Sequence, residues 1–108
     1  MLRLAELFLE GRGAVKDYIQ GMQWLRRAAN AGSAQGQLRL GNLYMDGIGV
    51  AQDPVMAHMW LNLAAARAND QILREAAIAM RDEVSAGLSS SELDQARRLA
   101  REWQSINT

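Results

Sequence analysis

Few side chains in this sequence could carry out acid–base, nucleophilic or metal chemistry. The 108 residues include no cysteine and one histidine, His58, so no thiolate nucleophile, disulfide or histidine pair is available. His58 falls beside the apolar stripe of its helical segment, which favours an exposed bystander over a catalytic base. No Gly-x-Ser-x-Gly motif supports a serine nucleophile. We therefore expect a protein with no catalytic residues, no metal and no cofactor.

Two glycine-rich segments, Gly11-Arg12-Gly13 and Gly47-Ile48-Gly49, could be mistaken for phosphate-binding loops. A dinucleotide site needs a strand before its glycines, whereas the pattern here predicts a helix, so a structural turn is the better interpretation. Asp17 and Asp53 follow these segments. Because each precedes a predicted helix, we expect both to be N-caps rather than catalytic acids or bases.

The best candidates for binding are polar side chains on one face of the first helix of each predicted repeat. In the second repeat they are 4, 3 and 4 residues apart, a spacing that places them opposite Leu40 and Tyr44. The predicted stripe consists of Arg3, Glu6 and Glu10, then Gln35, Arg39, Asn42 and Asp46, then Gln71, Glu75 and Asp82. Because the stripe carries both positive and negative side chains, it is suited to binding a peptide. The alternative is that these are the solvent-exposed positions that every soluble helix has.

Charge and composition exclude several classes of partner. The 12 Lys and Arg balance the 12 Asp and Glu, so the chain lacks the basic excess that holds proteins on nucleic acid. No window is apolar enough to span a bilayer, and charges interrupt the opening segment, so we expect neither membrane insertion nor a signal peptide. A cytoplasmic location is favoured. The periplasm is the alternative if an upstream signal has been removed.

The sequence repeats itself at an offset of 36 residues. Eleven of the 31 residues from position 2 to position 32 are identical to the residue 36 positions later, including Gly11, Gly13, Asp17 and Trp24. The composition would give about two or three identities by chance. Each repeat reads as two helices joined by a glycine turn.

In the second repeat, the Gly47-Ile48-Gly49 turn ends the first helix, and Asp53 with Pro54 begins the second. Small and large residues alternate on the apolar stripe behind this start, which predicts close packing of neighbouring helices. Three residues on such stripes, Trp24, Trp60 and Trp103, are expected in the core. The methionines Met45, Met56 and Met59 are interpreted as fillers of core gaps, with an adaptable binding surface as the alternative.

The last third of the chain keeps two predicted helices but joins them differently. The first is expected to end near Gly87, and Ser89 with Glu92 forms a predicted capping box for the second. That last helix is expected to close the array as a cap. Its arginines Arg97, Arg98 and Arg101 are interpreted as a solvated face, with a site for an acidic peptide as the alternative.

The segment LGNLYMDGIGVAQD (residues 40–53), followed by Ala57, Trp60, Ala64 and Ala65, resembles the Sel-one-like repeat (SLR), a relative of the tetratricopeptide repeat (TPR). The resemblance implies an all-α protein, a right-handed α-α superhelix of about three helix pairs with a C-terminal capping helix. Residues 1–108 would form one domain. Repeat one would span 1–33 without its first turn, repeat two 34–69, and a degenerate third pair with the cap 70–108.

The resemblance also implies a non-catalytic adaptor or scaffold, of the kind found in bacterial signalling and envelope pathways, that binds a protein or peptide on the concave face. A structural role is the alternative. The apolar residues Leu2, Leu4, Leu7, Phe8 and Leu9 belong to a first helix with no preceding repeat. Such a surface favours a homodimer through the N-terminal helix, or a C-terminal fragment of a longer repeat protein.

Overall fold

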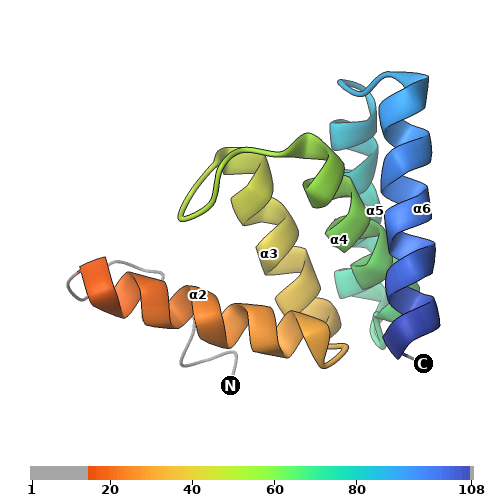
Figure 1. The fold of residues 1–108 in the computed structure, drawn as a ribbon. Helices are drawn as coiled ribbons and strands as arrows, with labels where there is room; N and C mark the ends of the chain where they lie inside the picture. Colours follow the sequence, from red (N-terminus) through yellow and green to blue (C-terminus); the bar gives the residue numbers. More distant parts are fainter. Residues whose placement is uncertain (1–14, 108) are drawn as a thin grey trace.

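The computed structural model describes residues 15–107, which form five helices and no strand (Figure 1). They are α2 (Val15–Asn30), α3 (Ala34–Asp46), α4 (Pro54–Arg67), α5 (Gln71–Ser85) and α6 (Ser90–Asn107). The predicted all-α fold class is confirmed. Repeat two of the sequence corresponds to α3 and α4, and the last third to α5 and α6. The predicted first helix, with Arg3, Glu6 and Glu10, lies outside the described residues.

The turn between α3 and α4 has the conformation that its glycines predict. Gly47 has φ 68° and Gly49 has φ 76°, values that favour glycine. The Gly47 N–H donates to the Leu43 carbonyl at 2.8 Å and closes the end of α3. The Asp53 N–H then donates to the Tyr44 carbonyl at 3.0 Å, which holds the turn against the helix that precedes it.

Asp53 is the N-cap of α4, as predicted, whereas Asp17 falls within the bounds of α2. The Asp53 Oδ1 accepts hydrogen bonds from the next two N–H groups of the first turn, at 3.1 and 3.2 Å. Asp17 lies inside α2, which begins two residues earlier at Val15. The difference follows from Pro54, because a residue before proline is disfavoured in the helical region. Asp53 is accordingly extended, with φ −148°, and no proline follows Asp17.

The last two helices also begin with side-chain caps. Asp70 accepts the Leu73 N–H at 2.7 Å at the start of α5. At the start of α6 the Ser89 N–H donates to Glu92 Oε1 at 2.9 Å, and the Glu92 N–H donates to Ser89 Oγ at 3.1 Å. These reciprocal bonds confirm the predicted capping box.

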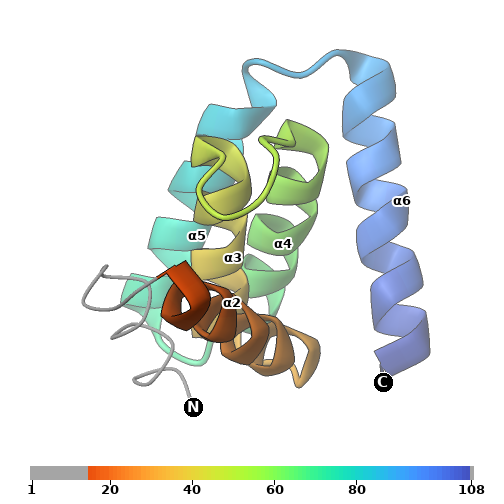
Figure 2. The same ribbon diagram turned by 60° about the vertical axis from the view of Figure 1, so that its left-hand side comes forward.

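Helix α4 is the centre of the molecule, because α3, α5 and α6 all pack against it. Helix α6 lies against α4 and stands apart from α5 over most of its length (Figure 2). The two helices of the third pair therefore flank α4 instead of packing on each other. The buried residues of α6, Ala96 and Ala100, are small and allow this close approach to α4.

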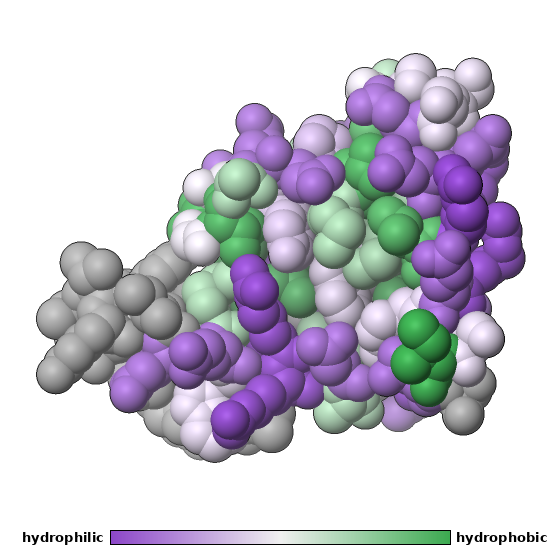
Figure 3. Space-filling model, in the orientation of Figure 1, coloured by the Kyte–Doolittle hydropathy of each residue, from purple (hydrophilic) through white to green (hydrophobic). Residues whose placement is uncertain are grey.

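The core joins α2, α3, α4 and α6. Its buried members are Met22, Leu25, Ala29, Leu40, Met59, Trp60, Leu63 and Ala100. Trp60 is 6% exposed and packs edge to face against Trp103, with ring centroids 6.0 Å apart. Trp24 and Trp103 are partly buried against this cluster. Apolar surface remains visible between α3, α4 and α6, bordered by hydrophilic side chains of α2 and α6 (Figure 3).

Contacts at the end of α6 connect it to the rest of the array. The Trp103 Nε1 donates to Asn30 Oδ1 of α2 at 3.3 Å. The Arg67 guanidinium of α4 lies 5.4 Å from the centroid of the Trp103 ring, a favourable cation–π distance. Arg67 also donates to the Gly32 carbonyl at 3.1 Å. Helix α6, which is predicted to be the cap, is thus attached to α2 and α4 by specific side-chain contacts.

Candidate functional site

A groove runs between α3 and α5, which lie side by side and run in the same direction (Figures 1 and 2). The part near the helix N-termini has a volume of about 270 Å³ and is lined by Gln35, Leu38, Arg39, Asn42 and Leu73. The part near the C-termini has a volume of about 330 Å³ and is lined by Asn42, Met45, Asp46, Leu61, Met80, Glu83 and Val84. Because Asn42 lines both parts, we treat them as one surface, the α3–α5 groove.

Helical spacing explains which residues face the C-terminal part of the groove. On α3, Asn42 is followed three and four residues later by Met45 and Asp46, and on α5, Met80 is followed in the same way by Glu83 and Val84. Residues at this spacing share a helix face. The buried side chain of Leu61 is contributed by α4, which lies behind both helices. The groove thus has an apolar floor and a polar rim.

The α3 part of the predicted stripe lines this groove. Gln35 and Asp46 are exposed, whereas Arg39 and Asn42 are half-buried, and all four face the same groove. The structure therefore brings together the four candidates that repeat two contributes.

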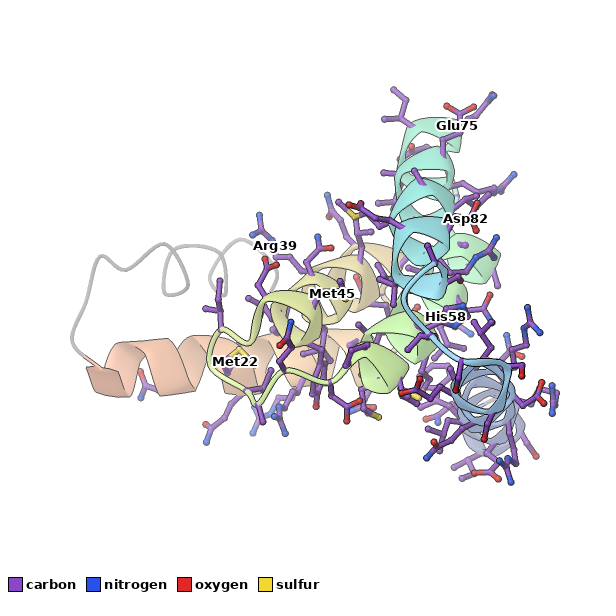
Figure 4. All side chains as sticks on the ribbon, turned by 90° about the horizontal axis from the view of Figure 1, so that it is seen from above. Met22, Arg39, Met45, His58, Glu75 and Asp82 are labelled. Atoms are coloured by element: carbon purple, nitrogen blue, oxygen red, sulfur yellow. The ribbon has the colours of Figure 1, made fainter. Side chains whose placement is uncertain are left out.

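The α5 part of the stripe does not line the groove. Gln71 and Glu75 are exposed and bond to each other, with Gln71 Nε2 donating to Glu75 Oε1 at 2.9 Å. Asp82 pairs with its neighbour Arg81 at 3.2 Å. Figure 4 shows Asp82 on the side of α5 away from Arg39 and Met45. These three residues are thus separate from the α3 candidates.

The change of face has a geometric cause. Helices α3 and α5 run side by side in the same direction, so opposite flanks of the two helices line the groove between them. Residues at equivalent positions of the repeat therefore do not face each other across it. The residues that do line the groove from α5, Leu73, Met80, Glu83 and Val84, were not predicted. Their spacing of three to four residues could have indicated that they share one helix face.

His58 is buried, which contradicts the prediction of an exposed side chain. It is 2% exposed and lies on α4, facing α5, where its Nε2 is 3.0 Å from Ser85 Oγ. The Ser85 hydroxyl donates to the Arg81 carbonyl at 2.9 Å, so Nε2 is the donor in the bond between histidine and serine. The prediction was wrong because α4 is covered on several sides, so its buried residues are not confined to one stripe.

The surroundings of His58 oppose its protonation. Burial lowers its pKa below the ordinary value of 6.5, and the positive charges of Arg81 and Arg97 lower it further, against a smaller opposite effect of Asp82. The buried Nδ1 has no hydrogen-bond partner. The neutral imidazole is therefore a structural group between helices, and it does not line the α3–α5 groove.

Two further features bear on function. Within residues 15–107, no group of three or more His, Cys, Asp or Glu side chains is arranged to hold a metal ion. In the same part of the chain, no helix has the length and apolar character needed to cross a membrane.

The comparisons with known proteins support the resemblance in the sequence. A family model described as "Sel1 repeat" matches residues 1–33 and again residues 34–69. Together the two matches cover more than half of the chain, and the second contains both α3 and α4. No curated protein matches the chain.

Proposed function

Because the chain belongs to the Sel1 repeat family, whose helical solenoids generally mediate protein–protein interaction, we propose that its α3–α5 groove binds a segment of a partner protein. The protein would act as an adaptor or scaffold. Sel1 repeat proteins are typically non-catalytic, and we extend this to the present chain.

The observation that carries the proposal is the composition of the α3–α5 groove. Ligand sites are concave and largely apolar, with a few polar groups that fix orientation. Here Leu61 and Val84 supply an apolar floor, while Asn42 offers both a donor and an acceptor at the centre of the groove. An amide at this place can pair with the backbone of a bound segment.

The dimensions of the groove fit a short segment of chain. Helix α3 has 13 residues and is therefore about 20 Å long. An extended peptide of about six residues spans that length.

To test this proposal, peptides that bind the purified chain are selected from a random library. The affinity of the enriched peptides is then measured by fluorescence anisotropy. Asn42→Trp fills the groove where its two parts meet, so the enriched peptides should bind this variant about tenfold or more weakly. Gln95→Trp is the matched control, because Gln95 is an exposed amide residue on α6. Peptides that bind the Asn42 variant and the wild type equally, or the absence of any enriched peptide, would overturn the proposal.

The alternative of self-association depends on residues outside the described part of the chain, from Leu2 to Leu9. It stays a prediction with its own test. Light scattering over a wide concentration range should show a dimer for the wild type and a monomer for Leu7→Glu if the N-terminal helix is the contact. A wild type that is monomeric at every concentration contradicts this alternative and leaves the groove proposal unaffected.

A further inference from the structure

The two ends of the α3–α5 groove differ in charge. Both helices run in the same direction, so their C-termini, at Asp46 and Ser85, lie at the same end. A helix C-terminus carries a partial negative charge of roughly half an elementary charge. The carboxylates of Asp46 and Glu83 line this same end from opposite sides. Two helix ends and two carboxylates therefore make one end of the groove electronegative.

The described chain leaves these two carboxylates without an ion-pair partner. Within residues 15–107, neither Asp46 nor Glu83 has an ion pair, and both are exposed. The nearest arginine in sequence to Glu83, Arg81, binds Asp82 and also donates to Asn62 Oδ1 at 3.2 Å. Its guanidinium is therefore engaged outside the groove.

The apolar side chains beside the carboxylates define the shape of a suitable occupant. Met45 and Met80 are half-buried and line the groove between the floor residues and the rim. Methionine is flexible and polarizable, so it adapts to an alkyl chain. Lysine and arginine lay an apolar stem along such a surface and keep the charged head group at the water boundary.

We propose that the partner segment inserts a lysine or arginine side chain into the C-terminal part of the α3–α5 groove. Its stem lies against Met45 and Met80, and its cationic head group lies between Asp46 and Glu83. This inference rests on the proposed function and specifies the chemistry of the partner. The charge complementarity of one groove end selects a basic segment over a neutral or acidic one.

The test uses a peptide enriched on the wild-type chain and a copy in which its basic residue is norleucine, which keeps most of the stem and removes the charge. Exposed ion pairs are individually weak, so loss of two of them should weaken wild-type binding by about tenfold. The double variant Asp46→Asn/Glu83→Gln should bind both peptides with equal affinity. The control Asp94→Asn/Glu102→Gln removes the same charge from exposed sites on α6 and should behave like the wild type.

Three outcomes separate this inference from the proposed function. A tenfold loss of affinity on norleucine substitution that disappears in the Asp46/Glu83 variant supports both the groove as a binding site and the basic partner residue. Enriched peptides that depend on Asn42 but contain no basic residue, or a norleucine effect that persists in that variant, overturn the basic partner and leave the groove standing. If no peptide depends on Asn42, the proposed function fails and this inference fails with it.

Discussion

Replacing Trp60 by alanine tests whether the packing of α6 on α4 stabilises the array. The Trp60 ring is 6% exposed and lies in the core cluster with Leu63 and Ala100. It meets Trp103 of α6 at an interplanar angle of 70°, a favourable edge-to-face arrangement. The substitution therefore removes core volume and an aromatic contact between two helices in one step.

The expected loss can be estimated from these contacts. Truncation of a buried tryptophan to alanine costs about 3 to 5 kcal/mol. The buried Nε1 of Trp60 has no hydrogen-bond partner, and its removal offsets part of this cost, so we expect the lower half of the range. For a domain of this size, such a loss lowers the melting temperature by more than about 10 °C. Trp60→Phe keeps a ring and removes the unpaired N–H, so it should cost less.

The assay is urea unfolding followed by circular dichroism. Ile106→Ala is the control because Ile106 is 81% exposed, and its free energy of unfolding should stay within about 0.5 kcal/mol of the wild type. A double-mutant cycle with Trp103→Ala should give a coupling of about 0.5 to 1.5 kcal/mol. Equal stability of the wild type and Trp60→Ala would refute the packing of α6 on α4.

Three further predictions concern single positions. The pKa of His58 lies below its ordinary value of 6.5, so unfolding takes up a proton and stability should fall as the pH drops below that value. One proton gives a slope of at most about 1.4 kcal/mol per pH unit, and His58→Gln should flatten the fall in stability below pH 6.5; an unchanged slope would contradict the buried neutral imidazole. Gly41→Ala should lower the free energy of unfolding by about 1 to 3 kcal/mol in urea, because the new Cβ would lie 2.8 Å from Leu61 Cγ; a stabilised variant would argue against this close helix contact. Asp53→Ala should cost about 0.5 to 2 kcal/mol and Asp17→Ala less, since only Asp53 precedes its helix; equal thermal shifts for the two variants would contradict this difference in position.

The features that could be predicted from the sequence are those that depend on residues close together in the chain. The turn at Gly47, the cap at Asp53 and the capping box of Ser89 each depend on a few adjacent residues, and the structure confirms all three. The groove residues on α3 could also be predicted, because the spacing of polar residues shows which of them share one helix face. The family resemblance rested on the same repeated local pattern, and the family match confirms it.

The predictions that failed needed information on packing between helices. His58 was placed outside the apolar stripe of its helix, yet α4 is enclosed by α3, α5 and α6, so a position beside the stripe is also buried. Asp82 was predicted to share one surface with the α3 stripe because it lies 36 residues after Asp46, whereas it lies on the side of α5 away from Arg39 and Met45 (Figure 4). In both cases the missing knowledge was how neighbouring helices are arranged around the residue, which the sequence of one helix does not contain.

The two sides of the groove differ in polarity. If α5 presented the polar residues that the 36-residue offset selects, both sides would be hydrophilic and water would satisfy them well. Instead α5 contributes mainly Leu73, Met80 and Val84, while α3 contributes amides and charges such as Asn42 and Asp46. Burial against α5 can then supply affinity, and polar contacts with α3 can fix orientation. This difference in composition between the two sides supports the proposal that the groove binds an amphipathic segment with a basic side chain.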